Sequence, residues 1–365
     1  MEEKTVLICP LDWGIGHATR CVPVIRKFME AGFHVVIAAD GRPLSFLKRE
    51  FPNCDFITFR GVKVTYSRSR WLLLKLCILS PRLLYGIFRE HRDLRRILRE
   101  TRAGIVVSDN RYGLWNRSVR TVFITHQINI QLPENIKFLQ GFVNKVLLSF
   151  IRRFDECWIA DFEMHQGLAG KLTHPLPSSL SNAYYIGTLS RFYNEKNQPD
   201  VSGPPQFELL VLLSGPEPQR TILEEKILSS LEESAFHSIV ISGKTEEISE
   251  YVINERIWVF SHLETSRMKK VLKESGMVIC RSGYSSIMDL VTVGKRAVLI
   301  PTPGQPEQEY LAHYLLEKKI FFSVPQKDFD LLYAIEMSKN YPGMVLRNDL
   351  KVLEERIRFF LPSSS

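Results

Sequence analysis

Residues 277–310 read MVICRSGYSSIMDLVTVGKRAVLIPTPGQPEQEY. Two short apolar runs, Met277–Cys280 and Ala297–Pro301, each lead into a loop of small and polar residues, and a helical pattern follows each loop. Strands that alternate with helices predict a parallel sheet covered by helices. Ligands bind such sheets at the carboxyl ends of the strands. This stretch therefore predicts an α/β fold with a ligand site on two neighbouring loops.

The first of these loops has the composition of a phosphate-binding site. Gly283 permits close approach of a ligand, and the polar groups of Ser282 and Ser285 lie at the positive end of the following helix. Asp289, one turn into that helix, is placed to accept ribose hydroxyls. The second loop, Thr302–Tyr310, carries groups suited to sugar hydroxyls. Together the loops predict a nucleotide-sugar pocket, with ordinary helix capping as the alternative.

The alternation of strands and helices extends over both halves of the chain. At 365 residues the chain exceeds the usual size of one domain. The stretch 194–206 is polar and contains three prolines, as is typical of a linker. We expect an N-terminal domain over 1–193, a linker over 194–206, a C-terminal nucleotide-sugar domain over 207–345, and a helix within 346–365 that packs back on the N-terminal domain. The expected strands are Thr5–Cys9, Phe33–Ala39, Asp55–Phe59, Gly104–Ser108, Thr121–Thr125, Trp158–Asp161, Tyr184–Gly187, Phe207–Leu213, Ser238–Ser242, Ile257–Phe260, Met277–Cys280 and Ala297–Pro301.

Composition and charge limit the class of protein. With 45% hydrophobic and 24% charged residues, the chain is globular rather than disordered. Its six cysteines form no CxxC pair, so we expect free thiols in a reducing compartment. The N-terminus lacks the pattern of a signal peptide, and no apolar run reaches the ~18–20 residues of a membrane span. We expect a cytoplasmic protein.

The charge is concentrated in the first half. Residues 1–200 hold 29 Lys+Arg against 18 Asp+Glu, which predicts an anionic partner on that side. The segments Arg60–Arg102 and Phe138–Phe154 interleave basic with apolar residues, which suits an anionic membrane interface on the inner face of the membrane. An amphipathic core helix with a solvated basic face is the alternative. Nucleic acid is not an expected partner, because no nucleic-acid-binding module accompanies the charge.

Polar residues that follow strands of the first half are candidates for chemistry. Gly14 and Gly16 let the backbone turn sharply off the first strand, and His17 at the start of the next helix is placed as a general base. Asp109 follows a strand and can orient an imidazole or an acceptor hydroxyl. His126 follows the next strand and can contact the acceptor. Each has a structural alternative, which is a helix cap or a satisfied surface histidine.

A third candidate loop, Ser214–Arg220, lies between a buried strand and a helix. The N–H groups of Ser214 and Gly215 are suited to phosphate oxygens, and Arg220 can add charge-assisted hydrogen bonds to a diphosphate. Two prolines in this loop remove N–H donors and so weaken the phosphate interpretation.

Over Ser261–Leu316 the sequence resembles the GT-B glycosyltransferases of family 28, the MurG-like UDP-N-acetylglucosamine transferases. The shared elements, in order, are Met268, the run Arg281–Asp289, Pro301-Thr302-Pro303 and Glu307-Gln308-Glu309. The resemblance implies two Rossmann-like domains that face each other across a cleft. It implies that Asp289 binds ribose. The donor-binding residues that we expect are Arg191, Ser214, Gly215, Arg220, Met268, Arg281, Ser282, Gly283, Ser285, Asp289, Glu307 and Gln308.

The resemblance extends to the role of several of these residues. It places Glu307 and Gln308 on the donor hexose and Arg191 on the base. Pro216 stands where the family has a second glycine, and Gln127 stands where it has glutamate, so the diphosphate and acceptor contacts at those points depart from the family pattern.

The implied reaction is inverting transfer of a sugar, N-acetylglucosamine or a related hexose, from a UDP-sugar to a lipid-linked or other hydrophobic acceptor. His17 would deprotonate the acceptor with help from Asp109. The helix starts at Ser214 and Ser282 would stabilise the departing diphosphate without a metal cofactor.

Two other functions remain open at this stage. The run Gly14–Cys21 also resembles the histidine loop of the UDP-sugar hydrolase of pseudaminic acid synthesis, in which water replaces the acceptor. The chain can also be a non-catalytic subunit that binds a nucleotide sugar for a transferase partner.

Overall fold

The computed structural model describes residues 4–61, 72–132, 134–193, 205–244, 249–346 and 350–361. The chain divides into two compact units, Met1–Leu189 with Asp349–Ser365, and Ser190–Asn348. Of the expected linker, residues 194–204 lie outside the described residues. Each unit is described here by itself.

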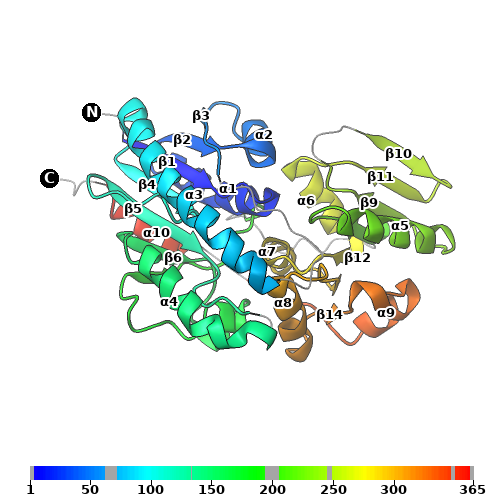
Figure 1. Ribbon diagram of the computed structural model, residues 1–365. Helices are drawn as coiled ribbons and strands as arrows, with labels where there is room; N and C mark the ends of the chain where they lie inside the picture. The colour runs from blue at the N-terminus through cyan, green and yellow to red at the C-terminus, as the bar shows by residue number, and fades with distance from the viewer. Residues whose placement is uncertain are drawn as a thin grey trace. The chain divides into compact units, whose positions relative to one another are not determined.

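The first unit is a parallel seven-stranded sheet with helices on both faces (Figure 1). Its strand order is β3-β2-β1-β4-β5-β6-β7, so the chain moves outward from β1 in one direction and then in the other. This is the order of a Rossmann-like fold, with the switch point between β1 and β4. Its elements are β1 (Thr5–Pro10), α1 (Ile15–Glu30), β2 (His34–Ala39), α2 (Gly41–Glu50), β3 (Asp55–Thr58), α3 (Leu72–Thr101), β4 (Ile105–Asp109), β5 (Arg120–Thr125), η1 (Glu134–Leu139), α4 (Gln140–Ile151), β6 (Glu156–Ile159), η2 (Met164–Gln166), η3 (Gly170–Leu172), β7 (Ala183–Tyr185) and α10 (Lys351–Arg358).

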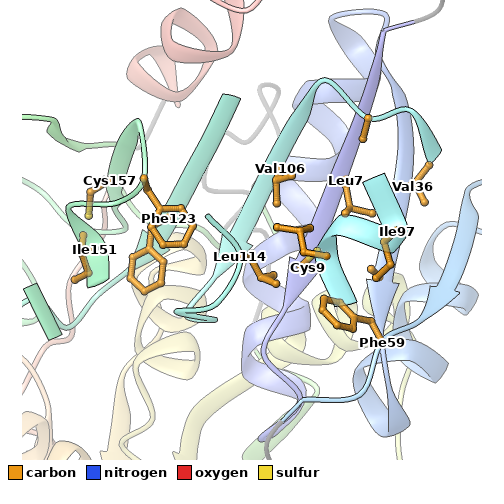
Figure 2. Close-up of a cluster of buried hydrophobic side chains, with 14 of the residues drawn as sticks. Leu7, Cys9, Val36, Phe59, Ile97, Val106, Leu114, Phe123, Ile151 and Cys157 are labelled. Carbon is orange, nitrogen blue, oxygen red and sulfur yellow. The ribbon is translucent and has the colours of Figure 1, made fainter. Parts of the chain in front are cut away.

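The core of this unit follows from the two-residue period of its strands. Leu7 and Cys9 of β1 point to the same face as Phe123 of β5, where Ile97 of α3 and Ile151 of α4 pack on them (Figure 2). All five side chains are at most 1% exposed. The helices α3 and α4 therefore cover one face of the sheet through a continuous apolar layer.

The opposite face is covered in part by α10, which follows the second unit in sequence. Trp158 of β6 lies on this face, and its ring is 6.3 Å from Phe360 and 6.4 Å from Phe28 of α1. Arg356 donates from Nε to a carboxylate oxygen of Glu156 at 3.0 Å. The chain thus returns to its first unit to complete the packing over β6.

The long helix α3 carries the expected basic segment 60–102. Residues 62–71 of that segment lie outside the described residues. Further along α3, Leu84, Tyr85 and Phe88 are 50–71% exposed. No helix in the described part of the chain is long and apolar enough to cross a membrane.

The second unit repeats the Rossmann-like plan. Its strand order is β10-β11-β9-β8-β12-β13-β14, with the switch point between β8 and β12, and only β10 runs antiparallel to its neighbour. Its elements are β8 (Phe207–Leu212), α5 (Gln219–Glu232), β9 (Ser238–Ile241), β10 (Glu250–Ile253), β11 (Ile257–Phe260), α6 (Thr265–Glu274), β12 (Ser275–Cys280), α7 (Tyr284–Val293), β13 (Ala297–Leu299), α8 (Pro306–Glu317), β14 (Phe322–Ser323), η4 (Gln326–Asp328) and α9 (Leu331–Ser338).

This unit has its own apolar core. Leu209 and Val211 of β8 and Ile279 of β12 pack against Leu223 and Ile227 of α5, all at most 2% exposed. A separate core in each unit explains why the strand and helix pattern starts afresh after residue 206.

Candidate active site

The first candidate site lies at the switch point of the first sheet. The helix α1 begins at Ile15, so His17 lies in its first turn. Asp109 is the last residue of β4, which pairs with β1. Because both strands end at this edge, the fold brings the two side chains together although 92 residues separate them.

His17 and Asp109 form a hydrogen-bonded pair. The Nδ1 atom of His17 lies 3.1 Å from Oδ2 of Asp109. The Asp109 side chain is fully buried, while the His17 side chain is 18% exposed. The contact with Asp109 favours a proton on Nδ1 of His17, because a carboxylate can only accept, whereas Nη2 of Arg20, 2.8 Å from the same nitrogen, can only donate. In the tautomer with the proton on Nδ1, the Nε2 atom is left to accept a proton from a substrate.

Arg20 completes this cluster, although its position in the sequence does not mark it as a site residue. Its Nε atom lies 2.8 and 2.9 Å from the two carboxylate oxygens of Asp109, and its Nη2 atom also contacts Oδ1. The same Nη2 atom is 2.8 Å from Nδ1 of His17, and Nη1 is 2.5 Å from Nδ1 of His126. Arg20 is 1% exposed, so one buried guanidinium joins the three predicted residues.

The charges around this cluster fix its protonation. Burial and the neighbouring Arg20 lower the pKa of His17 below its ordinary 6.5, although Asp109 opposes this. Burial alone would raise the pKa of Asp109, but Arg20 and His17 outweigh it and hold that pKa at about 2. At neutral pH the pair is therefore a neutral imidazole beside a carboxylate, which is the state that a general base needs.

The glycines before His17 leave room at this edge. Gly14 precedes α1 in an extended conformation, and a Cβ atom at Gly14 would meet nothing within 4 Å. Gly16 accepts a hydrogen bond from Oγ1 of Thr19, which closes the first turn. Gly14 is the N-cap residue of α1, and packing does not require a glycine there, which leaves room for a ligand to approach.

The second candidate site lies at the switch point of the second sheet. Ser214 and Gly215 follow β8, and both are exposed. Gly215 has a φ of +104°, a conformation that other residues rarely adopt. Gly283 is the N-cap of α7, and a Cβ atom there would meet nothing within 4 Å. The loops after β8 and β12 therefore present small residues and helix N-termini at one edge.

Arg281 holds three loops of this unit together. Its guanidinium donates to the carbonyls of Ile300, Pro301 and Gln219 at 2.8–3.3 Å. The residue is 1% exposed. Because its side chain donates to backbone carbonyls, Arg281 positions these loops, and its expected contact with the donor stays a prediction.

Gln308 has a similar structural part. Its Oε1 atom accepts from the N–H of Thr302 at 2.9 Å, and its carbonyl accepts from Oγ of Ser282 at 2.8 Å. The start of α8 is thereby tied to the loops after β12 and β13. Glu307 precedes Gln308 in the first turn of α8 and is partly exposed, and Ser285 is partly exposed in the first turn of α7. Their expected contacts with the donor stay predictions.

Asp289 and Arg191 lie together. This agrees with the expectation that Asp289 binds the ribose and Arg191 binds the base of one nucleoside. Oδ2 of Asp289 is 3.5 Å from Nε of Arg191, and Oδ1 accepts from Oγ of Ser190 at 2.6 Å. Burial raises the pKa of Asp289, and Arg191 and Ser190 oppose that shift. Ribose and base contacts at this pair remain a prediction.

Two other expected donor contacts have different surroundings. Arg220 is 6% exposed and forms ion pairs with Glu217 and with Glu224, the latter at 2.9 Å. Its charge is balanced by two carboxylates, and its expected contact with the diphosphate stays a prediction. Met268 is 5% exposed on the buried face of α6, where it contributes to packing.

Comparisons with known proteins agree with this geometry. Residues 219–336 match the Glycosyltransferase family 28 C-terminal domain. A UDP-N-acetylglucosamine–N-acetylmuramyl-(pentapeptide) pyrophosphoryl-undecaprenol N-acetylglucosamine transferase of Rickettsia akari is 22% identical over 335 residues, which cover 86% of this chain and 84% of the relative. The chain is therefore a glycosyltransferase that carries a family 28 C-terminal domain.

Other relatives of this glycosyltransferase support the same assignment. An uncharacterized glycosyltransferase of Methanosarcina acetivorans is 23% identical over 313 residues, or 81% of this chain and 79% of the relative. Among solved structures, MurG of Acinetobacter baumannii has a TM-score of 0.54 at 13% identity, with 98% and 99% of the two chains covered. Spinosyn rhamnosyltransferase SpnG with thymidine diphosphate has a TM-score of 0.64 at 11% identity, with 97% and 95% covered. The fold is GT-B.

The chain has one Asp-x-Asp sequence, Asp328-Phe329-Asp330. Oδ1 of Asp330 accepts from the N–H of Tyr333 at 2.8 Å and so caps α9. Within the described ranges no group of three or more His, Cys, Asp or Glu side chains is arranged to hold a metal ion. Activity without a metal stays a prediction.

Proposed function

We propose that this glycosyltransferase transfers N-acetylglucosamine or a related hexose from a UDP-sugar to a hydroxyl of a lipid-linked or other hydrophobic acceptor, with inversion at the anomeric carbon. The observation that carries the proposal is the pair of His17 and Asp109 at the switch point of the first sheet. The relative from Rickettsia akari is named for UDP-N-acetylglucosamine and an undecaprenol-linked acceptor, and its name supports this choice of substrates.

In the proposed reaction the acceptor oxygen attacks the anomeric carbon of the donor. Nε2 of His17 takes the proton of the acceptor hydroxyl as the new bond forms, and the bond from the anomeric carbon to the diphosphate breaks. Asp109 stabilises the imidazolium that results, as a buried carboxylate does in other acid–base pairs. The diphosphate leaves with the negative charge. The N–H groups at the start of α7 and at the start of the loop after β8 stabilise it.

The test uses UDP-N-acetylglucosamine and a panel of polyprenyl-linked and detergent-soluble acceptors, with products separated by mass. His17→Ala should lower kcat at least 10²-fold, about what loss of a general base costs, and leave the donor Kd within about twofold. His313→Gln is the matched control, because His313 is 70% exposed on α8. Full activity of His17→Ala would remove His17 from the mechanism.

The products also separate the alternatives. Free sugar as the only product, at a rate that no acceptor changes, would favour a hydrolase. Donor binding without turnover, restored by a partner protein, would favour a non-catalytic subunit. Activity should be unchanged by EDTA, because the proposed charge stabilisation uses N–H groups. Loss of activity in EDTA that Mg²⁺ or Mn²⁺ restores would contradict metal-independent transfer.

We further propose that the enzyme associates peripherally with the cytoplasmic face of an anionic membrane through exposed aromatic residues of the first unit. Tyr85 and Phe88 of α3 and Phe142 of α4 are 68–71% exposed, and Arg152 and Arg153 follow α4. Phe88→Ser with Phe142→Ser should reduce sedimentation with phosphatidylglycerol vesicles. Leu332→Ser, at a 64% exposed position of the second unit, should not. Equal sedimentation of all variants would refute this surface.

A further inference from the structure

An open pocket of about 910 Å³ lies in the first unit, between the C-terminal end of α3 and the loop before β5. Arg95, Arg99 and Arg102 line it from α3 and the residue that follows it, and Arg117 lines it from the loop. Trp115 and His91 also line it. No lining residue is acidic. The pocket therefore gathers four positive charges around one hollow.

The arginines of the pocket differ from their neighbours on the same helix. Arg92 and Arg96 have a carboxylate nearby, Asp93 at 3.6 Å and Glu100 at 3.8 Å. Arg95, Arg99, Arg102 and Arg117 have no carboxylate within ion-pair distance in the described part of the chain. Between Arg92 and Arg102, the arginines without a nearby carboxylate are thus the ones that line the pocket.

The aromatic part of the pocket is held in place. The rings of His91 and Trp115 stack with centroids 4.0 Å apart, and Nδ1 of His91 lies 3.3 Å from the carbonyl oxygen of Gly113. The guanidinium of Arg153 lies 5.1 Å from the Trp115 ring. Burial lowers the pKa of His91, although its contact with Gly113 opposes the shift, so the charge of the pocket comes from the arginines.

The pocket is separate from the site at His17. It includes Ala103 and Gly104, which precede β4, and Arg117–Val119, which precede β5. Asp109 ends β4 and His126 follows β5, at the opposite ends of the same strands. A strand of five residues rises about 3.3 Å per residue, so roughly 15 Å of sheet lies between the pocket and the catalytic pair.

We propose that this pocket binds an anion that carries two or more phosphate charges. Four arginines and no lysine line the hollow, and the planar guanidinium matches phosphate oxygens with paired donors. Like charges gathered without carboxylates repel one another, and a multiply charged anion removes that repulsion. The same chemistry belongs to a soluble diphosphate and to a phospholipid headgroup, and the experiment below separates these sources.

The probe is inorganic pyrophosphate, and the readout is the ¹⁹F spectrum of the full-length enzyme that contains 5-fluorotryptophan. The chain has five tryptophans, and Trp115→Phe identifies the resonance of Trp115. Pyrophosphate should shift that resonance saturably. Arg99→Gln and Arg117→Gln should each weaken Kd about tenfold, the effect of one lost charge-assisted contact. Arg92→Gln and Arg96→Gln, which keep the pocket intact, should bind within about twofold of the original.

The other outcomes decide the source or overturn the site. A shift with phosphatidic acid vesicles, whose phosphomonoester headgroup carries up to two charges, that exceeds the shift with pyrophosphate identifies a lipid headgroup, and the reverse identifies a soluble anion. A Trp115 resonance that does not respond to either probe overturns the proposal. So does equal binding by Arg99→Gln, or a shift given by an RNA oligonucleotide alone. Pyrophosphate bound only at the loops of the second unit would leave the Trp115 resonance unshifted, and the two sites are thereby distinguished.

Discussion

At the scale of single residues, burial and Arg20 together set the protonation of the His17–Asp109 pair. Arg20 contacts both oxygens of Asp109 and also approaches Nδ1 of His17. Burial disfavours the imidazolium most, and the cation beside the ring adds to this effect, while the carboxylate opposes it. The pKa of His17 is therefore lowered, which favours the neutral imidazole at neutral pH.

Replacing Arg20 should therefore change the pH dependence of the enzyme. In Arg20→Gln the pKa of His17 should rise, and the acid limb of kcat/KM against pH should move to higher pH, because activity is lost as His17 gains a proton. Arg20→Lys keeps the positive charge, so its acid limb should lie closer in pH to that of the original enzyme. A limb that is unmoved in Arg20→Gln would contradict this role. The glutamine variant should also lose about 3–5 kcal/mol of stability, because Asp109 stays buried without its cation.

The sequence was informative about which loops matter and less so about what each side chain does. His17, Asp109 and His126 were selectable because each follows a strand, and the structure brings them together. Arg20 was not, because an arginine in the second turn of a helix normally faces solvent. Arg281 was assigned to the donor, since the sequence cannot show that its guanidinium turns back to carbonyls 19 to 62 residues away.

At the scale of elements, strands buried on both faces were the most predictable. The apolar runs that become β1, β8 and β12 have no competing interpretation, and their ends differ from expectation by one or two residues. The strand β10 was not expected, because three of its four residues are exposed and its sequence carries no alternation. The helix α9 lies in a stretch whose apolar spacing is irregular.

The helix α10 should contribute to the stability of the first unit through its buried face. Leu353 is 0% exposed, and Leu353→Ala should lower the free energy of unfolding by about 2–5 kcal/mol. Val352, the adjacent residue, is 40% exposed, and Val352→Ala should change stability by about 0.5 kcal/mol or less. Urea denaturation followed by the fluorescence of the tryptophans measures both. Equal effects would show that α10 does not pack as described.

At the scale of the whole molecule, the second unit is continuous in sequence and has its own core. A fragment of residues 190–348 should therefore fold cooperatively by itself. It should bind UDP, if the loops after β8 and β12 hold the diphosphate, and it should transfer no sugar, because His17 and Asp109 are absent. Calorimetry and thermal melting with UDP test both statements. A fragment that folds and does not bind UDP would refute the donor assignment of this unit.

The first unit, in contrast, is assembled from two separate parts of the chain. During synthesis on a ribosome, β1 to β7 emerge long before α10, and the faces of Phe28 and Trp158 that meet Phe360 must wait for it. The second unit can complete its fold in that interval, since all its strands have already been made. The second unit is thus expected to mature before the first, and the unit that carries His17 becomes complete only after α10 has emerged.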